Sequence, residues 1–372
     1  MKIQQVSNAP EGLVVTWQND ETDTYPWFWL FDHGEDGNSQ NQRTLQREID
    51  TFGIDRNIEA QSARLSPDGT RVLLQWRGET THVSAARLAE CVGRGERPAG
   101  RALWKRGSLP DPIPTIDFEQ VQSSEHGLLD WLKLIHRRGF AVVENTPPTK
   151  DGTVRLAERI GSAQSTIFGD YWLLSNEITE HDDTAYTNQY LSPHTDASYS
   201  HDAPGLQMFN CLEFDGKGGE SVLVDGFAIA AEMAERSPEW YKVLTQVIVP
   251  GQYIEPGVHL LAERPVLRLD RLGELVQVTF NNYDRAPFML PPEQLRAFYD
   301  AYGEFNRLGT DQENWIKLPL RPGMALIFDN WRCLHGRMGY VGKRVFYGCY
   351  LSRAFYESRL QALSHSLVAT AA

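Results

Sequence analysis

Two side chains that commonly bind metal ions stand on either side of one threonine in the stretch NQYLSPHTDASYS. If this stretch is an extended strand, His194 and Asp196 point to the same face, because alternate residues of a strand share a face. A second histidine, His335, stands in FDNWRCLHGRMGY, directly after a strand-like segment. Two imidazoles and one carboxylate leave three coordination positions open on Fe(II). These residues therefore form a candidate iron site.

Each of these residues also has an ordinary structural explanation. An HxD pair is common, so His194 could be a surface histidine beside a turn carboxylate, and His335 could bond a backbone carbonyl in the core. Arg344 favours the metal interpretation, because it lies in GKRVFYGCY, an otherwise apolar strand. A cation in such a strand usually needs a carboxylate partner. A 2-oxo acid that chelates the metal at one end would offer such a carboxylate at its other end.

Composition limits the classes of function. The 372 residues, 41% of them hydrophobic, are enough for one large domain and a smaller one. The net charge of −13 argues against a nucleic-acid binder that uses a basic surface, but leaves small anionic ligands open. The four cysteines are scattered without a CxxC motif, which favours a reduced, cytoplasmic protein. We see no signal peptide and no apolar run long enough to cross a membrane.

The chain divides into three predicted regions. Residues 1–95 are expected to form a small β-rich N-terminal domain, with strands at Val14–Gln18 and Arg71–Trp76. The sequence SPDGT, Ser66–Thr70, predicts a hairpin turn before the second of these strands. Residues 96–117 are rich in Pro, Gly and basic residues and are expected to be a linker.

Residues 118–372 alternate short strands with long connections. SSEHGLLDWLKLIHRRG predicts a helix with Ser123 or Ser124 as its N-cap and Gly139 at its end, and a buried strand follows over Phe140–Asn145. Two further helices are predicted over DGFAIAAEMAERSP and PPEQLRAFYDAYGEFNRLG. Further strands are predicted over GLQMFNCLEF, ESVLVDGF, KVLTQVIVP, PVLRLD, LVQVTFNN, MALIFDN and RVFYGCYLS. This order predicts a mainly β fold with flanking helices, a double-sheet jelly roll rather than a parallel doubly wound sheet.

The motifs taken together carry a family resemblance. HTD, PGLQ, GGES, VDGF, FNN, FDNWRCLHGR and GCY resemble the Fe(II)/2-oxoglutarate-dependent oxygenases of the γ-butyrobetaine hydroxylase and trimethyllysine hydroxylase branch, within the taurine dioxygenase superfamily. The resemblance covers roughly residues 120–355, and YPWFWLFDHG and THVS extend it to the small domain. It implies a double-stranded β-helix (jelly roll) catalytic domain, an Fe(II) cofactor, 2-oxoglutarate and O₂ as cosubstrates, and hydroxylation of an unactivated C–H bond.

The resemblance also implies roles for individual residues near the metal. It assigns iron binding and catalysis to His194, Asp196 and His335. It assigns the distal carboxylate of 2-oxoglutarate to Arg344, with a hydroxyl offered by Ser221 of GGES. Gln207, in PGLQ, belongs to the same cosubstrate-binding group.

Aromatic residues suggest the substrate class. Aromatic faces around a pocket attract a quaternary ammonium ion, at roughly 0.5–2 kcal/mol for each good face, although any one of these rings could equally be part of a hydrophobic core. The resemblance places a trimethylammonium cage at Phe168, Trp172, Tyr186 and Tyr350. Phe168 stands where a tyrosine is common in the family. Asp183 stands where asparagine is common, and its carboxylate could assist the cation or repel an anionic group.

The other end of such a substrate is anionic. Asn281 and Asn282, in VTFNNYDRAP, match the family's carboxylate-side amides, and Arg285 follows them. Ala197 stands directly after Asp196, where the family often has an aromatic residue, and Tyr199 comes next but one. The small Ala197 could enlarge the anion side enough for a tetrahedral phosphonate.

These residues predict a hydroxylase of a small zwitterion with a trimethylammonium group. γ-Butyrobetaine and its phosphonate analogue, 2-(trimethylamino)ethylphosphonate, are equally consistent with the sequence. Trimethyllysine ranks below them, because no residue for an α-amino acid is located. Two alternatives stay open, an oxygenase of a substrate without an ammonium group, such as a sulfonate, and a non-catalytic betaine-binding protein. The resemblance implies a homodimer, and neither nucleic acid nor membrane is expected as a partner.

The small domain departs from the family pattern. Family members commonly hold a structural Zn²⁺ there through three cysteines and a histidine, whereas LFDHGEDGNSQNQR contains no cysteine. His82, in THVS, remains, and a site built from His33, His82 and carboxylates is conceivable. Tetrahedral structural sites usually rely on thiolates. We therefore predict no zinc in this domain, and a hydrogen-bonded loop over Asp32–Asn38.

Overall fold

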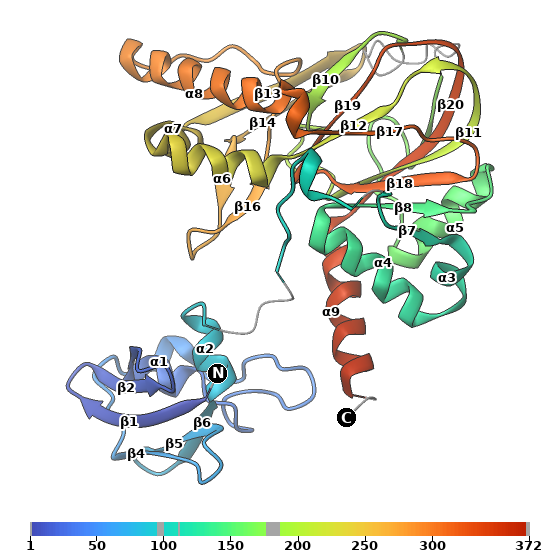
Figure 1. The fold of residues 1–372 in the computed structure, drawn as a ribbon. Coiled ribbons are helices and arrows are strands. Elements are labelled where there is room, and N and C mark those ends of the chain that lie inside the picture. Colours follow the sequence, from blue (N-terminus) through green and yellow to red (C-terminus); the bar gives the residue numbers. More distant parts are fainter. Residues whose placement is uncertain (1, 95–99, 111, 176–186, 370–372) are drawn as a thin grey trace. The chain divides into compact units, whose positions relative to one another are not determined.

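The chain divides into two compact units, residues 1–99 and 100–372, in a computed structural model (Figure 1). The structure describes residues 2–94, 100–110, 112–175 and 187–369. Part of the predicted linker belongs to the larger unit. Trp104 is buried there, its backbone N–H donates to the Asp225 carboxylate at 3.0 Å and its indole N–H donates to the Arg138 carbonyl at 2.6 Å. Burial of this indole explains why the boundary lies earlier than the expected end of the linker.

The small unit contains two three-stranded antiparallel sheets, ordered β1-β2-β3 and β4-β5-β6. Its elements are β1 (Ile3–Ala9), β2 (Gly12–Trp17), β3 (Thr22–Pro26), α1 (Trp27–Asp32), η1 (Thr51–Gly53), β4 (Ser62–Leu65), β5 (Arg71–Gln75), β6 (Thr80–Ser84) and α2 (Ala85–Cys91). The two predicted strands are confirmed as β2 and β5. The predicted turn is also confirmed, because the Gly69 N–H donates to the Ser66 carbonyl at 2.9 Å and Gly69 has a φ of 70°.

The stretch Asp32–Asn38 forms the hydrogen-bonded loop that the sequence predicts. The Glu35 N–H donates to the His82 carbonyl at 2.8 Å, and the Asn38 N–H donates to the Asp36 carboxylate at 3.0 Å. The Asp32 carboxylate accepts a hydrogen bond from the Thr51 hydroxyl at 2.7 Å. These bonds give polar groups of the loop partners within the small unit.

The larger unit is built on two sheets. The six-stranded sheet has the order β7-β8-β18-β11-β20-β9, and the four-stranded sheet has the order β10-β19-β12-β17. Within them, β7 and β8 are parallel and the other pairs are antiparallel. The strands are β7 (Thr115–Asp117), β8 (Phe140–Glu144), β9 (Tyr171–Leu174), β10 (Leu191–His194), β11 (Leu206–Gly218), β12 (Ser221–Asp225), β17 (Trp315–Leu318), β18 (Met324–Asp329), β19 (Cys333–Arg337) and β20 (Tyr340–Leu351). The predicted mainly β fold with helices is confirmed.

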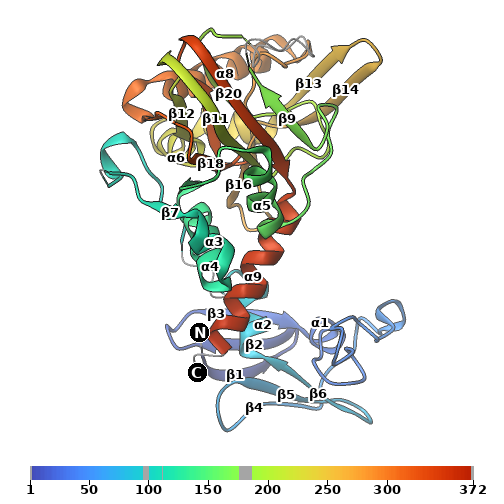
Figure 2. The same cartoon turned by 90° about the vertical axis from the view of Figure 1, so that its right-hand side faces the viewer.

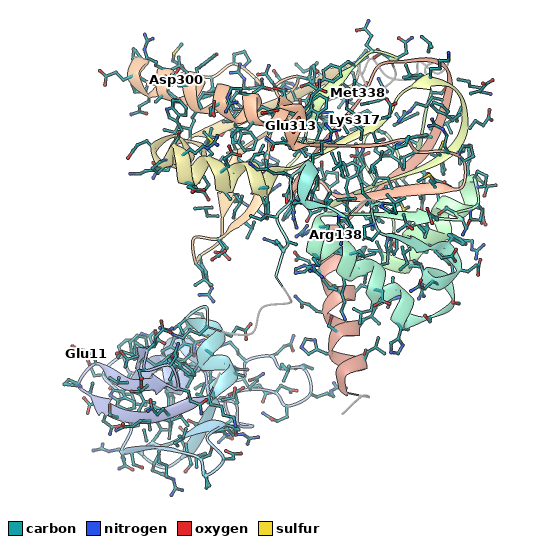
Figure 3. All side chains as sticks on the ribbon, viewed as in Figure 1. Glu11, Arg138, Asp300, Glu313, Lys317 and Met338 are labelled. Atoms are coloured by element: carbon teal, nitrogen blue, oxygen red, sulfur yellow. The ribbon has the colours of Figure 1, made fainter. Side chains whose placement is uncertain are left out.

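Helices and two hairpins complete this unit. They are η2 (Arg106–Ser108), α3 (Phe118–Ser123), α4 (Glu125–Arg138), α5 (Lys150–Ile160), α6 (Gly226–Arg236), α7 (Pro238–Gln246), α8 (Pro292–Thr310), η4 (Gln312–Asn314), α9 (Arg353–Ala369), and the strand pairs β13 (Ile248–Glu255) with β14 (Val258–Pro265) and β15 (Leu267–Leu269) with β16 (Leu275–Val278). Asp300, exposed on α8, marks the outer surface of one helix (Figure 3). None of the described helices combines the length and apolar composition of a membrane span.

Alternation along the strands sorts the core into layers. Ala141, Val143 and Met208 face a cluster with α3, α4, α5 and α9, whereas Phe140 and Val142 face a cluster between the two sheets. A third cluster packs α6, α7 and α8 against the four-stranded sheet. Figure 2 shows the helices of the first cluster, α3, α4, α5 and α9, from the side. The inner cluster fills the space between the sheets and thereby fixes the inward-facing residues of both.

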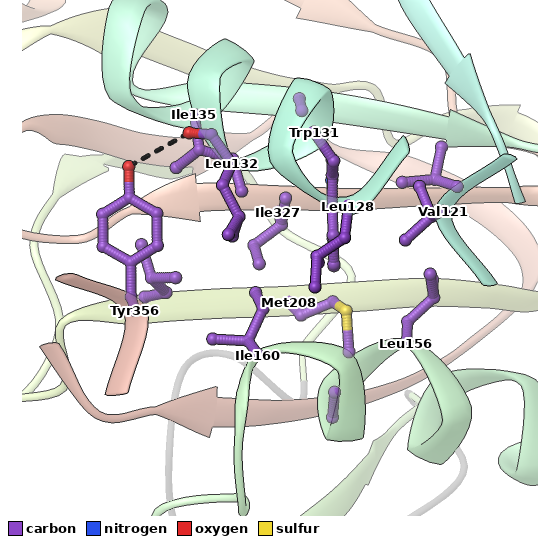
Figure 4. Packing of buried hydrophobic residues seen from close by; sticks show 14 of the residues in the cluster. Val121, Leu128, Trp131, Leu132, Ile135, Leu156, Ile160, Met208, Ile327 and Tyr356 are labelled. Atoms are coloured by element: carbon purple, nitrogen blue, oxygen red, sulfur yellow. Dashed lines mark hydrogen bonds between the residues drawn. The ribbon is translucent and has the colours of Figure 1, made fainter. Parts of the chain in front are cut away.

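The predicted helix α4 is confirmed with both of its ends. The Ser124 hydroxyl accepts a hydrogen bond from the Gly127 N–H at 2.9 Å, and Gly139 ends the helix with a left-handed φ of 81°. Buried residues of α4 contact the sheet near Met208, and the Tyr356 hydroxyl of α9 donates to the Leu132 carbonyl at 3.3 Å (Figure 4). This packing holds α4 and α9 together on the six-stranded sheet.

One predicted strand is wrong in its first half. KVLTQVIVP contains the end of helix α7, and the strand β13 begins only at Ile248. Pro238 stands in the first turn of α7, where its fixed φ suits a helix start. Leu244 is fully buried against α6 and α8, so tertiary packing outweighs the β-branched composition.

The loop analysis predicts the metal content of the small unit. We expect iron-stripped protein to retain no tightly bound zinc, because the loop has no thiolate and its carboxylates already accept hydrogen bonds. Elemental analysis after dialysis against a chelator measures this directly. One zinc ion per chain that survives dialysis would contradict the prediction.

Candidate metal centre and its cavity

Three potential metal ligands meet between the two sheets. His194 and His335 are register partners on β10 and β19, and Asp196 follows β10. The Nε2 atoms of His194 and His335 lie 3.2 and 3.4 Å from one oxygen of Asp196. Ligand atoms about 2.1 Å from an ion and at right angles to each other are about 3 Å apart, so the donor set fits a single divalent metal. Among the described residues, this is the group of side chains found close enough to share an ion.

Asp196 reaches this point through a turn and not through the expected strand alternation. β10 ends at His194, and Ala197 has a left-handed φ of 57°, which is uncommon for a residue other than glycine. The Asn330 side chain holds the turn by accepting from the Asp196 N–H at 2.9 Å and donating to the Asp196 carbonyl at 3.2 Å. Thr195, between the two ligands, donates its N–H to the Phe280 carbonyl at 2.7 Å.

Hydrogen bonds also orient the ligand side chains. His194 Nδ1 lies 2.8 Å from the Ser192 carbonyl, so Nδ1 carries a proton that it donates to this carbonyl, and Nε2 is directed at Asp196. The Tyr350 hydroxyl donates to the second oxygen of Asp196 at 2.7 Å. Burial would raise the pKa of the Asp196 carboxyl, but the imidazoles of His335 and His194 hold it well below its usual range. The carboxylate is therefore ionised and has one oxygen directed at both imidazoles.

A buried ion pair supports the turn that carries Asn330. The Arg332 guanidinium donates two hydrogen bonds to Asp225, at 3.0 and 2.7 Å, and both side chains are almost inaccessible to solvent. Arg332 also donates to the carbonyls of Ala102 at 2.7 Å and Arg137 at 3.1 Å. This network joins β12, the turn before β19, α4 and the segment that leads into the unit.

The predicted cosubstrate residues line the same cavity as the three metal ligands. Arg344, Gln207 and Ser221 all face it. Arg344 is buried with its guanidinium 3.8 Å from the Phe346 ring centroid, and burial lowers its pKa to about 10, so it stays charged at neutral pH. The Arg344 Nε and the Gln207 side-chain oxygen are buried without hydrogen-bond partners in the described part of the chain. Such groups are costly unless a ligand satisfies them.

Glycine in GGES makes room for the arginine. Gly219 has a φ of 71°, and a β-carbon there would lie 3.3 Å from Cδ of Arg344 and 3.2 Å from Cβ of Tyr340. The GGES motif therefore allows the Arg344 side chain to pass close to the chain that carries Ser221.

Predicted cage residues also line the cavity. These are Phe168, Trp172 and Tyr350, and Tyr199, predicted from the sequence on the anion side, lines the cavity as well. The rings of Trp172 and Tyr350 have centroids 5.3 Å apart and planes at 62°. Phe168 and Tyr199 both contact Tyr253, at ring-centroid distances of 5.9 and 5.1 Å. Tyr253 lies in β13, and no sequence motif had identified it. Asp183 and Tyr186 lie outside the described residues.

The predicted anion-side residues separate in the structure. Asn281 lines the cavity, where its amide donates to the Asp284 carboxylate at 2.6 Å and its oxygen accepts from the Tyr283 N–H at 2.9 Å. Asn282 is exposed and accepts a hydrogen bond from Arg285 at 3.1 Å, so it does not face the metal ligands. Arg285 lines a smaller adjoining cavity, and Asn281 borders both.

Sequence reasoning missed three polar residues of the cavity wall, Tyr283, Asp284 and Arg337. Arg337 stands next but one to His335 on β19, so strand alternation could have identified it. Its guanidinium donates to the carbonyls of Thr187 at 2.6 Å and Gln189 at 3.0 Å. Asp284 follows the predicted asparagines, but only the fold shows that its carboxylate faces the cavity.

Comparisons with known proteins extend over most of the chain. The model of the family described as "Taurine catabolism dioxygenase TauD, TfdA family" matches residues 105–350. The chain is 34% identical to mitochondrial trimethyllysine dioxygenase of Rattus norvegicus over 340 residues, which cover 88% of this chain and 80% of that protein. It is 28% identical to γ-butyrobetaine dioxygenase of Pseudomonas sp. (strain AK-1) over 362 residues, 95% of this chain and 94% of that protein. A solved taurine dioxygenase from Burkholderia xenovorans matches 60% of this chain and 81% of its own, with 14% identity and a TM-score of 0.46.

The buried ion pair generates a stability prediction. Arg332→Met leaves the Asp225 charge buried without its cation, and such changes lower the free energy of unfolding by about 3–5 kcal/mol. Urea denaturation followed by circular dichroism measures the change. Arg268→Met is the matched control, because Arg268 also lies over an aromatic ring, that of Trp331, and no buried carboxylate of the described residues pairs with it. A loss no larger than that of the control would show that the pair does not support the fold.

Proposed function

The chain belongs to the taurine catabolism dioxygenase TauD, TfdA family, and from this premise we propose that it hydroxylates a small quaternary-ammonium acid. It is an Fe(II)- and 2-oxoglutarate-dependent dioxygenase, and the resemblance inferred from its motifs is confirmed. The substrate, the roles of individual residues and the assignment of the two facing sheets as a double-stranded β-helix are parts of the proposal.

One observation carries the proposal. A single cavity contains the three metal ligands, the buried cation Arg344 and the angled ring pair of Trp172 and Tyr350. A trimethylammonium group has no N–H to donate, so aromatic faces are the groups that recognise it. The arrangement therefore supports a cosubstrate anion at one side of the metal and a substrate cation at the other.

Each residue then has a physical task. His194, Asp196 and His335 bind Fe(II), which together with 2-oxoglutarate and O₂ supplies the oxidation of a substrate C–H bond, with succinate and CO₂ as the other products. Arg344 binds the distal carboxylate of 2-oxoglutarate, and Ser221 and Gln207 complete that polar surface. The apolar cluster between the sheets keeps bulk water from the ion pair between Arg344 and the 2-oxoglutarate carboxylate, and so strengthens that pair.

The residues around Asn281 favour binding of an acidic group at the end of the substrate opposite its ammonium group. Asn281 is held by two hydrogen bonds, so its remaining amide N–H has a fixed direction. Arg264 and Arg285 line the adjoining cavity behind it and add positive charge. Ala197 lines the main cavity with only a methyl group, which leaves room beside Asp196. We propose γ-butyrobetaine and 2-(trimethylamino)ethylphosphonate as the substrates that match this side.

Trimethyllysine is the second candidate, and two observations favour it. The chain is more similar to the trimethyllysine dioxygenase of Rattus norvegicus, at 34% identity, than to the γ-butyrobetaine dioxygenase of Pseudomonas, at 28%. The Asp284 carboxylate lines the cavity beside Asn281, and an α-ammonium group would pair with it. The sequence alone ranked this substrate lower because it offered no such residue.

The remaining alternatives are less consistent with the cavity. A non-catalytic betaine-binding protein needs neither three metal ligands nor a buried arginine beside them. A sulfonate substrate gives no task to the angled ring pair of Trp172 and Tyr350. The expected homodimer and cytoplasmic location stay predictions.

Substrate-dependent succinate formation tests the proposed function. Protein loaded anaerobically with Fe(II) is given 2-oxoglutarate, O₂ and, separately, γ-butyrobetaine, 2-(trimethylamino)ethylphosphonate or trimethyllysine at equal concentration. We expect at least one of the first two to stimulate succinate formation, because the rings accept the cation and Asn281 faces the anion. Stimulation by trimethyllysine alone would favour the second candidate, and stimulation by none would reject the proposal.

Trp172→Ala supplies the control for the cage. We expect it to reduce the stimulated rate far more than the slow decarboxylation of 2-oxoglutarate without substrate. Equal loss of both rates would indicate that Trp172 has only a structural role.

Removing the buried cation tests the cosubstrate site. Arg344→Met removes a hydrogen bond between charged groups, which contributes about 1.5–3 kcal/mol, so the KM for 2-oxoglutarate should rise about 10- to 100-fold. Initial rates at varied 2-oxoglutarate measure it. Arg321→Met is the control, because Arg321 lies over the Phe214 ring but is exposed. An unchanged KM in Arg344→Met would show that the anchor is elsewhere.

A further inference from the structure

Tyr350 contacts both the metal ligand Asp196 and the aromatic cage residue Trp172. Its hydroxyl donates to Asp196 at 2.7 Å, and its ring meets Trp172 at a centroid distance of 5.3 Å. Tyr350 is buried, and both its ring and the Asp196 carboxylate face the cavity. A cage residue needs only the ring, so the hydroxyl requires a separate explanation.

The fold fixes this contact from two directions. Tyr350 lies on β20 opposite Gln207 of β11, and Gly348 precedes it on the same face of the strand. A β-carbon at Gly348 would lie 2.1 Å from the Trp172 indole, so the indole rests directly on the strand. With Trp172 on one side and Asp196 on the other, the Tyr350 ring has little freedom to rotate.

We propose that Tyr350 is a positioning residue that couples occupation of the aromatic cage to metal binding by Asp196. Its hydroxyl holds the second Asp196 oxygen, so the first oxygen stays directed at the Nε2 atoms of His194 and His335. Partners of this kind orient metal-binding carboxylates and raise metal affinity. The coupling to the substrate rests on the proposed function, whereas the positioning of Asp196 does not.

The coupling has a physical cause. A quaternary ammonium ion over the Tyr350 ring draws electron density toward the ring face. The phenol O–H then becomes a stronger donor to the Asp196 carboxylate, and hydrogen bonds to ionised groups respond most. Because binding free energies are reciprocal, a cation that favours metal binding is itself bound more tightly when the metal is present.

Metal titration without any substrate tests the positioning role. We expect Tyr350→Phe to raise the Co²⁺ dissociation constant about 10- to 100-fold, as loss of a residue that orients a metal ligand does. Tyr347→Phe is the matched control, because Tyr347 lies on the same strand, stacks on Tyr171 at 5.7 Å, and is half-buried outside the cavity. Thermal melts of the metal-free variants establish that both fold. An unchanged Co²⁺ affinity in folded Tyr350→Phe would overturn the proposal.

A second titration tests the coupling, with tetramethylammonium as the probe because it reproduces the trimethylammonium group that the three candidate ammonium substrates share. In wild-type protein and in Tyr347→Phe we expect saturating tetramethylammonium to tighten Co²⁺ binding about fivefold or more. In Tyr350→Phe, which keeps the ring, the cation should bind without changing the Co²⁺ affinity. Equal tightening in Tyr350→Phe would overturn the coupling.

These results separate the proposal from the proposed function. Wild-type protein that binds Co²⁺ but not tetramethylammonium would reject the cage and with it the coupling. The substrate-free titration would still decide whether Tyr350 positions Asp196.

Discussion

The ion pair between Arg332 and Asp225 is the interaction on which the larger unit depends. Both groups are removed from water, which is favourable only when the hydrogen-bonding capacity of the pair is used. Asp225 accepts from the Trp104 N–H as well, and Arg332 donates to three further carbonyls, so four chain segments meet at one guanidinium. Asn330, in the same turn, holds the backbone of Asp196. Burial of one ion pair thereby determines where a metal ligand stands.

A comparison of two buried arginines distinguishes a structural role from ligand binding. Arg332 is surrounded by a carboxylate and backbone carbonyls of its own chain. Arg344 faces an aromatic ring and the cavity, and its Nε has no partner in the described part of the chain. Burial acts to lower the pKa of both guanidinium groups, but the Asp225 carboxylate raises the pKa of Arg332 above its usual value, whereas the pKa of Arg344 is lowered by burial and by the neighbouring Arg337 charge. An arginine that the fold leaves unsatisfied in a cavity is the one that we propose for binding the cosubstrate anion.

The sequence predicted the features that depend on local signals. Ser124 and Gly139 mark the ends of α4 by their own backbone chemistry, and an arginine in an apolar strand marks a buried cation. Features that depend on pairing between distant segments were not predictable. The turn at Ala197 is held by Asn330, and Tyr253 reaches Phe168 only because β13 packs beside the cavity. The helical half of KVLTQVIVP likewise follows from burial of Leu244 between helices, which composition does not reveal.

Gly348 has no side chain, and this allows the Trp172 indole to pack directly against the strand β20. Every other amino acid at this position carries a β-carbon and would lift Trp172 away from the strand and toward the space that a ligand occupies. The residue at position 348 therefore limits the size of the ligand, although it is not itself one of the residues that line the cavity. Efforts to redesign selectivity by exchanging only the residues that line the cavity would leave that limit in place. Relatives that share all the lining residues but differ here would be expected to accept ligands of different breadth.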